Sequence, residues 1–229
     1  ENMVIVTSDS GGDSAYTSIN IVNNGVFKKI HDAHNSLLGK IYTSTTLLLG
    51  MRPNEHEYKI MGLAPYASEF HKADPREIFL DALKVEGLDF VKATDMKDFF
   101  FYFKEKLKKF RFDGIAGGLQ DFVEIRLVEW FQNIVTETGI GDIVFSGGVA
   151  NNVKANKRLC ELDCVKTLFV PVGPGDESLA IGAAYCVIYD KLGPQKAMEV
   201  IMPQQNAYWG SSVDTNDNER FRNDPFVLE

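Results

Sequence analysis

The stretch of this sequence with the clearest chemical potential is a glycine-rich turn followed by two acids. It reads VGPGDESLAIGAAY over 172–185, and Asp176 stands between the turn and an apolar run of small residues. Aspartate is a preferred N-cap residue, and such a cap contributes about 1 kcal/mol to a helix. A carboxylate at the same place could also bind a divalent cation or lie beside a phosphate. The residues alone leave these alternatives open.

Two further turns combine glycine with side chains that can bind a ligand. Gly147 and Gly148 follow an apolar run and precede Asn152. Glycines after a strand let the backbone approach a ligand, and the next helix start directs N–H groups toward it. The other turn, DSGGD from Asp9 to Asp13, could hold a phosphate, a magnesium ion or a substrate hydroxyl. An ordinary tight turn remains an alternative for both.

A charged cluster at 55–59, EHEYK, runs directly into the apolar segment IMGLAPY. Its carboxylates could stabilise a helix start through the helix dipole, or accept hydrogen bonds from both hydroxyls of a ribose. His31 and His34 are three residues apart, but their flanks predict a loop and no further ligand spacing completes a metal site. No Ser-His-Asp or Cys-His arrangement is visible, so nothing indicates a covalent nucleophile.

Alternating elements position these turns in the second half of the chain. Apolar residues spaced by three and four predict a long helix over 115–134, with Gly139 as its C-terminal stop. Strands are predicted at 142–146 and 167–170, each followed by a glycine turn and a helix. This alternation predicts an α/β fold with parallel pairing, in which ligands bind at the carboxyl ends of the strands.

The first half is predicted to begin with a β-hairpin, its strands at 4–7 and 16–22. Four helices are expected after it, at 35–49, 58–64, 75–84 and 96–109. The helices between 89 and 112 are expected to face solvent, because charged and aromatic residues cluster there. We therefore expect a helical insert at 70–112 and a polar tail at 211–229.

The composition excludes several functional classes. The 229 residues carry a net charge of -8 and are 45% hydrophobic, as in ordinary globular domains. An overall electrostatic grip on nucleic acid or on an anionic membrane is not expected at this charge. No apolar run approaches the length of a membrane span, and no secretory signal is visible. The three cysteines have no metal-type spacing, so we expect a cytoplasmic protein with reduced thiols.

Three motifs, in order and spacing, resemble the O-carbamoyltransferases of the nodulation-protein-U type. They are HEYKIMGLAPYA at 56–67, SGGVANNVKANKRL at 146–159 and PVGPGDESLAIGAAY at 171–185. The resemblance implies a ribonuclease-H-like, actin-like (ASKHA) domain, a mixed sheet with helices on both faces, present here in part. It also implies a YrdC-like domain outside this chain, which makes carbamoyl-adenylate from carbamoyl phosphate and ATP. The domain represented here then transfers the carbamoyl group to a hydroxyl of a small-molecule acceptor.

The resemblance implies roles for individual residues. Asp176 matches an aspartate that completes a divalent metal site of iron type with two histidines, which we expect upstream of this chain. Gly147, Gly148 and Asn152 match residues beside the nucleotide, and Gly175 is assigned to the same site. Glu55, Glu57 and Lys59 match the segment that flanks the adenosine. Asp9, Gly12 and Asp13 match a loop that faces the phosphate and the acceptor. Within this loop, Asp9 and Asp13 are the expected catalytic residues.

The sequence thus predicts that 1–210 is part of the transferase domain of an ATP-dependent O-carbamoyltransferase, truncated on its N-terminal side and inactive alone. Two departures from the family pattern, Asn151 for a bulky apolar residue and Ser10 for a glycine, favour an alternative. In that alternative the chain is a non-catalytic nucleotide-binding or regulatory module of the same fold. A sugar kinase is a weaker third possibility, because the HEYKIMGLAPY segment does not suit it.

Overall fold

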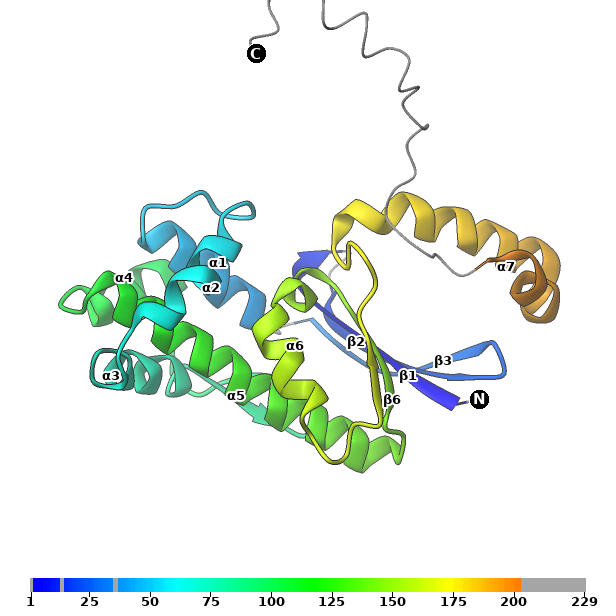
Figure 1. Ribbon diagram of the computed structural model, residues 1–229, viewed down its shortest axis with the longest axis horizontal. Coiled ribbons are helices and arrows are strands. Elements are labelled where there is room, and N and C mark those ends of the chain that lie inside the picture. Colours follow the sequence, from blue (N-terminus) through cyan, green and yellow to red (C-terminus); the bar gives the residue numbers. More distant parts are fainter. Residues whose placement is uncertain (1, 13–14, 35–36, 203–229) are drawn as a thin grey trace, which may run out of the picture.

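The computed structural model describes residues 2–12, 15–34 and 37–202 and has a five-stranded mixed sheet at its centre (Figure 1). The strand order is β3-β2-β1-β6-β7. Strand β2 is antiparallel to both β1 and β3, whereas β1, β6 and β7 run parallel. The strands are β1 (Asn2–Gly12), β2 (Ala15–Asn23), β3 (Val26–Ala33), β6 (Asp142–Ser146) and β7 (Thr167–Phe169).

The central strand β1 shows why this sheet forms. Its β-branched residues alternate, so that Val4 and Val6 are fully buried while Ile5 and Thr7 lie on the opposite, partly exposed face. Val6 pairs with Ile19 of β2 on one side and with Phe145 of β6 on the other, and both partners are also buried. The period-two pattern therefore fixes one face of the sheet against the core.

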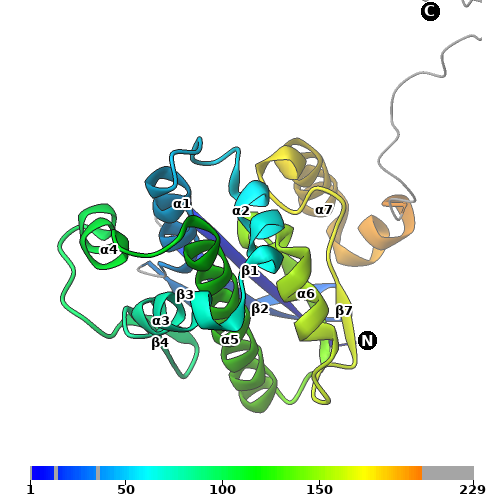
Figure 2. The same cartoon turned by 60° about the vertical axis from the view of Figure 1, so that its left-hand side comes forward.

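The long helix α5 (Phe112–Thr138) is the main element packed on that buried face. Its Phe131 ring meets the Phe145 ring edge-on, with centroids 5.1 Å apart. Gly139 ends the helix as predicted, in a left-handed conformation with φ of 68°. Figure 2 shows α5 and α6 (Val153–Cys160) lying in front of the sheet. Both predicted parallel strands are confirmed, and each is followed by its glycine turn.

The region between 70 and 112 differs from the expected helical insert. It contains α3 (Glu69–Leu80), a hairpin of β4 (Leu83–Glu86) and β5 (Asp89–Lys92), and α4 (Phe99–Leu107). The prediction that a helix begins at Pro75 was wrong, because α3 starts six residues earlier and carries Pro75 inside it. Pro75 packs closely against Gly118 of α5, where a side chain on the glycine would overlap it.

Two further features of the first and last elements were not predicted. The flanks of His31 form strand β3 rather than a loop, and His31 Nε2 lies 2.8 Å from Asp89 Oδ1 of the β4–β5 hairpin. Helix α7 (Leu179–Val200) breaks at Gly193, whose φ is 74°, and the helical part that follows this break was not predicted. The Tyr189 hydroxyl donates to the Gly25 carbonyl at 3.0 Å, which ties α7 to the β2–β3 turn.

The remaining elements are α1 (Leu38–Leu48), α2 (Glu57–Leu63) and the short 3₁₀ helices η1 (Ala64–Tyr66), η2 (Gly148–Asn151) and η3 (Asp176–Ser178). Helices α1 and α2 confirm two of the predicted helices. Within the described ranges, no helix is both long and apolar enough to cross a membrane. The expected tail at 211–229 and the end of the expected 1–210 domain lie outside the described residues.

Candidate functional site

A cavity of about 680 Å³ opens at the carboxyl ends of the parallel strands. The end of β1 and the segments after β6 and β7 form one side of it, and α1, α2 and the segment between these two helices form the other. Parallel strands bring their carboxyl ends to one edge of the sheet, which is why three turns far apart in sequence meet here. The predicted site residues that line the cavity are Asp9, Glu55, Glu57, Gly148, Asn152, Gly175 and Asp176.

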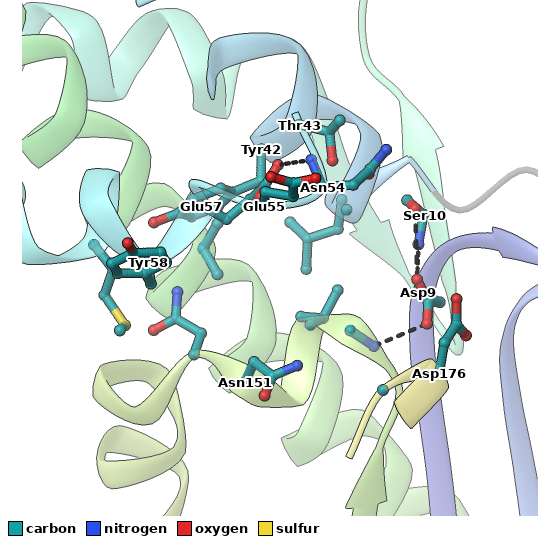
Figure 3. A pocket seen from close by; sticks show the side chains of 18 of the residues that line it. Asp9, Ser10, Tyr42, Thr43, Asn54, Glu55, Glu57, Tyr58, Asn151 and Asp176 are labelled. Atoms are coloured by element: carbon teal, nitrogen blue, oxygen red, sulfur yellow. Dashed lines mark hydrogen bonds between the residues drawn. The ribbon is translucent and has the colours of Figure 1, made fainter. Parts of the chain in front are cut away.

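The Asp9 carboxylate connects two of these turns (Figure 3). Its Oδ1 accepts a hydrogen bond from the backbone N–H of Ser10 at 2.6 Å. Its Oδ2 accepts from the backbone N–H of Gly148 at 2.9 Å, across 139 positions in sequence. Both oxygens are therefore held in a fixed orientation at the cavity wall. A carboxylate bound by two N–H groups retains further lone pairs for a ligand.

Gly147 allows the turn after β6 to pass close to β1. Its φ is 93°, and a Cβ at this position would overlap the carbonyl oxygen of Ser8. Only glycine fits both constraints. The Gly147 N–H and the Ser146 hydroxyl both donate to the Pro174 carbonyl, at 2.7 and 2.8 Å. These bonds join the two glycine turns to each other, so Gly147 acts on the backbone of the site and does not itself line the cavity.

Asp176 is the first residue of η3 and does not cap it. The N-cap position belongs to Gly175, and no side chain caps this helix. The Asp176 side chain is exposed, lines the cavity and makes no hydrogen bond or ion pair with any described residue. Its neighbour Glu177 turns back instead, accepting the Gly175 N–H at 3.1 Å. Of the alternatives left open by the sequence, a carboxylate free to meet a ligand is the one that this geometry favours.

The opposite wall comes from α1 and from the segment leading into α2. Tyr42 and Thr43 of α1 line the cavity, and neither was predicted as a site residue. Burial raises the pKa of the Tyr42 hydroxyl well above its ordinary value, and the negative charges of Glu57 and Glu124 add to this. Tyr42 is therefore a neutral hydroxyl over the whole physiological range.

The predicted carboxylates of this wall are already partly engaged. Glu57 Oε1 accepts the backbone N–H of Asn54 at 2.8 Å, as a residue at a helix start often does. Glu55 pairs with Arg52 at 3.0 Å, and both side chains are exposed. Tyr58 lines the same wall with 62% of its surface exposed, so its ring presents an open aromatic face.

The cavity is rich in acid. Its lining includes five carboxylates and, within the described part of the chain, no lysine, arginine or histidine. The carboxylates belong to Asp9, Glu55, Glu57, Asp176 and Glu177. An anionic ligand must therefore be held by neutral donors or arrive with a cation, because no basic side chain of this wall can neutralise it.

Four predicted site residues are not placed in the lining. Gly12 and Gly147 do not line the cavity, although the neighbouring Gly11 and Gly148 do. The Lys59 ammonium lies 5.8 Å from the centroid of the Tyr58 ring and also does not line it. Asp13 lies outside the described residues. No sequence signal distinguished Tyr42 and Thr43 from the other residues of an apolar helix, which is why they were missed.

The chain is similar both to a protein-family model and to several individual proteins. The family model "Carbamoyltransferase N-terminus" matches residues 1–185. An uncharacterised protein of Methanocaldococcus jannaschii is 31% identical over 197 residues, covering 79% of this chain and 36% of that protein. The nodulation protein NolNO of Sinorhizobium fredii is 28% identical over 218 residues, covering 93% of this chain and 31% of that protein.

The nodulation protein NolO of Bradyrhizobium diazoefficiens is also similar, at 26% identity over 219 residues, with 93% of this chain and 39% of that protein covered. The chain thus spans about a third of the length of these curated relatives. The family match covers most of the chain and includes every residue that lines the cavity. The chain therefore belongs to the carbamoyltransferase family, in the part of it described as the carbamoyltransferase N-terminus.

Proposed function

We propose that this chain is part of an ATP-dependent O-carbamoyltransferase and that its cavity holds carbamoyl-adenylate during transfer to a hydroxyl of a small-molecule acceptor. The observation that carries the proposal is the convergence of the Asp9, Gly148 and Gly175 turns on one cavity at the carboxyl ends of β1, β6 and β7. About 680 Å³ falls within the usual range of small-ligand sites. In this proposal the mixed sheet is one half of an actin-like fold.

The walls of the cavity suit the two ends of an adenylate. The exposed ring of Tyr58 can stack on the purine, and the free oxygen of Glu57 can accept from a ribose hydroxyl. At the other side, the N–H groups of Gly148 and Gly175 already donate to the Asp9 and Glu177 carboxylates, so these carboxylates face the place proposed for the phosphate. Because the lining has five carboxylates, a divalent cation would have to accompany the phosphate.

The transfer itself is a substitution at the carbamoyl carbon. The acceptor hydroxyl oxygen forms a bond to that carbon, and the bond from the carbon to the phosphate oxygen breaks. AMP leaves with the electron pair, and the hydroxyl proton passes to a carboxylate. Asp9 is our candidate for the proton acceptor, because Ser10 and Gly148 fix its orientation at the cavity wall. No covalent intermediate on a side chain is required.

The divalent metal of iron type that the family implies fits this chain in part. Asp176 offers a carboxylate that no described residue engages, and a hard oxygen donor suits such an ion. Among the described residues, no group of three His, Cys, Asp or Glu side chains is arranged to hold a metal. We propose that Asp176 supplies one ligand and that two histidines outside this chain supply the others. When bound, the ion would stabilise negative charge on the phosphate.

The test uses the longer natural protein, together with its Asp9→Ala variant. The protein is incubated with carbamoyl phosphate, ATP, Fe²⁺ and a panel of hydroxyl acceptors, and AMP and carbamoylated product are measured by mass spectrometry. The proposal expects the natural protein to form both AMP and carbamoylated product, with the proposed YrdC-like domain making the carbamoyl-adenylate. It expects the variant to lose the carbamoylated product. Absence of both AMP and product across a broad acceptor panel would overturn it.

A non-catalytic nucleotide-binding module is the second candidate. The observation that favours it is Asn151, which departs from the family pattern and lines the cavity with an exposed amide. A module of this kind would bind AMP or ATP in calorimetry, yet form no carbamoylated product in the longer protein. The same experiment thus separates the two candidates.

A further inference from the structure

Gln120 is a buried glutamine behind the cavity wall that was not among the predicted site residues. We propose that Gln120 is a positioning residue that orients the amide of Asn152 toward the cavity. Gln120 lies on α5, is 1% exposed and does not line the cavity itself. A buried amide of this kind is retained only where its hydrogen bonds are satisfied. The choice of ligand in the test below rests on the proposed function, but the positioning role does not.

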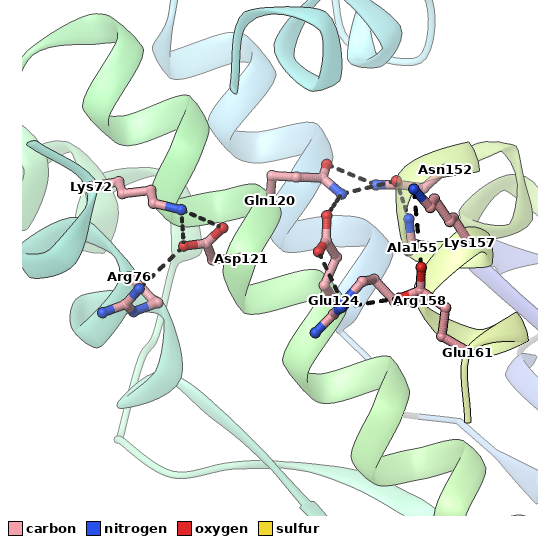
Figure 4. A network of polar contacts seen from close by, with 10 residues as sticks. All are labelled: Lys72, Arg76, Gln120, Asp121, Glu124, Asn152, Ala155, Lys157, Arg158 and Glu161. Atoms are coloured by element: carbon pink, nitrogen blue, oxygen red, sulfur yellow. Dashed lines mark hydrogen bonds and ion pairs between the residues drawn. The ribbon is translucent and has the colours of Figure 1, made fainter. Parts of the chain in front are cut away.

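Every hydrogen-bonding group of the Gln120 amide is engaged, and Figure 4 draws its bonds to Glu124 and Asn152. Its Nε2 donates to Glu124 Oε1 at 2.9 Å and to Asn152 Oδ1 at 3.0 Å. Its Oε1 accepts from Asn152 Nδ2 at 3.0 Å and from the Tyr42 hydroxyl at 3.4 Å. Gln120 therefore touches two cavity residues that come from different elements, α1 and the turn before α6.

The chemistry of the neighbours leaves only one orientation for each amide. Glu124 is a carboxylate and can only accept, so the nitrogen of Gln120 must face it. The backbone N–H of Ala155 donates to Asn152 at 3.1 Å, so the oxygen of Asn152 must face the start of α6. With both amides fixed, Asn152 Nδ2 faces Gln120 Oε1 and donates the second hydrogen bond between the two side chains. The pair is therefore directional, and neither amide can flip without leaving two donors face to face.

This directionality decides what Asn152 presents to the cavity. Its Oδ1 is occupied by Gln120 and Ala155, and one N–H of its Nδ2 is occupied by Gln120. No described residue accepts from the second N–H. Because Asn152 lines the cavity, this N–H is available to a ligand oxygen. Because this wall is lined by carboxylates, a neutral N–H donor is a group that can bind an anionic ligand here.

The outer end of the network is also anchored. Glu124 is 18% exposed, and its Oε2 lies 3.9 Å from Arg158 Nε of α6, while Arg158 pairs with Glu161 at 3.1 Å. The network thus runs from the surface of α6, through the inside of α5, to the cavity.

The neighbouring residue on α5 offers a matched control. Asp121 faces the other way and binds Lys72 and Arg76 of α3, at 2.8 and 3.2 Å (Figure 4). None of these three residues lines the cavity. Asp121→Asn therefore disturbs a polar contact of the same helix, one residue away, without reaching Asn152.

The first measurement needs no ligand. The side-chain amide signals of Asn152 are assigned by their loss in Asn152→Asp, and then followed by ¹⁵N NMR in Gln120→Leu and Asp121→Asn. Gln120→Leu is expected to shift these signals and to speed their hydrogen exchange by about tenfold or more, because it removes both partner groups. Asp121→Asn is expected to leave them unchanged. Unchanged Asn152 signals in folded Gln120→Leu would overturn the proposal.

The second measurement is a double-mutant cycle on AMP affinity by calorimetry. Asn152→Asp keeps the helix cap but cannot donate to a ligand. Gln120→Leu and Asn152→Asp are each expected to weaken AMP binding by about tenfold, and the double variant by about tenfold as well, since both act on one N–H. Asp121→Asn is expected to keep the wild-type affinity.

The outcomes separate this proposal from the proposed function. A hundredfold loss in the double variant would show that Gln120 acts independently of Asn152 and would overturn the positioning role. Failure of the wild-type chain to bind AMP would count against the proposed function but not against the positioning role. The NMR measurement would still decide whether Gln120 orients Asn152. Circular dichroism melting curves establish that each variant is folded before either measurement is interpreted.

Discussion

The carboxylate of Asp9 and the backbone N–H of Gly148 form a 2.9 Å hydrogen bond that joins the end of β1 to the turn after β6. The Ser10 N–H occupies the other carboxylate oxygen at 2.6 Å. Asp9 thus has a structural role in addition to its proposed chemical one. It holds the first and second glycine turns at a fixed separation.

Asp9→Asn tests that role, because two backbone N–H groups donate to the Asp9 carboxylate. An asparagine has one oxygen, so one backbone N–H must face an NH₂ group, and we expect the free energy of unfolding to fall by about 1 kcal/mol. Urea denaturation monitors the change. Asp98→Asn is the control, because Asp98 accepts a single N–H, from Phe101 at 3.0 Å, and asparagine caps a helix equally well. Equal losses in the two variants would contradict the two-donor role of Asp9.

Gly147 is expected to be intolerant of a side chain. Gly147→Ala places a Cβ against the Ser8 carbonyl in a left-handed backbone, so we expect a loss of about 3 kcal/mol or more in the free energy of unfolding. Gly62→Ala is the control, since Gly62 lies in α2 with no atom near its Cβ position, and we expect a gain of up to about 1 kcal/mol. Thermal denaturation measures both. A well-folded Gly147→Ala chain of unchanged stability would disprove the close approach.

Tyr58 is expected to control nucleotide affinity through its exposed ring. Tyr58→Ala should weaken AMP binding by about 1–3 kcal/mol, the range measured when an aromatic partner of a base is removed. Tyr58→Phe keeps the stacking face and should bind AMP with nearly wild-type affinity. Calorimetry gives both values. Similar affinities for all three proteins would place the purine elsewhere in the cavity.

Tyr42 is expected to make stability depend on alkaline pH. Burial raises the pKa of its hydroxyl, so the folded chain keeps the proton after the unfolded chain has begun to lose it. Stability from this group is therefore complete below about pH 10, the ordinary tyrosine pKa, and is lost as the pH rises above it, by at most about 1.4 kcal/mol per pH unit.

Tyr42→Phe should remove this part of the pH dependence. Urea denaturation between pH 8 and pH 11 compares the two proteins, and the wild-type curve should fall more steeply at the alkaline end. At pH 8 the variant differs only by the weak bond to Gln120, which spans 3.4 Å. Parallel curves up to pH 11 would show that the Tyr42 hydroxyl is not shielded from solvent.

The sequence by itself determined the local elements and the family. The spacing of apolar residues in α5, the stop at Gly139 and the strand–glycine–helix units after 142 all follow from local rules, and each is confirmed. Parallel strands then imply one binding edge, so the turns at Gly148 and Gly175 could be assigned to it before any contact was known, whereas Asp176 was assigned to the site by resemblance. The three ordered motifs indicated the family, and with it carbamoyl transfer, only by resemblance.

Only the tertiary structure decided which residues meet. The Asp9–Gly148 bond and the Gln120–Asn152 pair join positions 139 and 32 residues apart, and no periodicity within a segment records such a distance. Local rules also failed at Pro75, a residue that normally breaks or begins a helix but here lies inside α3, packed against Gly118 of the facing helix. Asp176 shows the same division. The sequence placed it at a helix start, but only the packing of the turns left its carboxylate free to face the cavity.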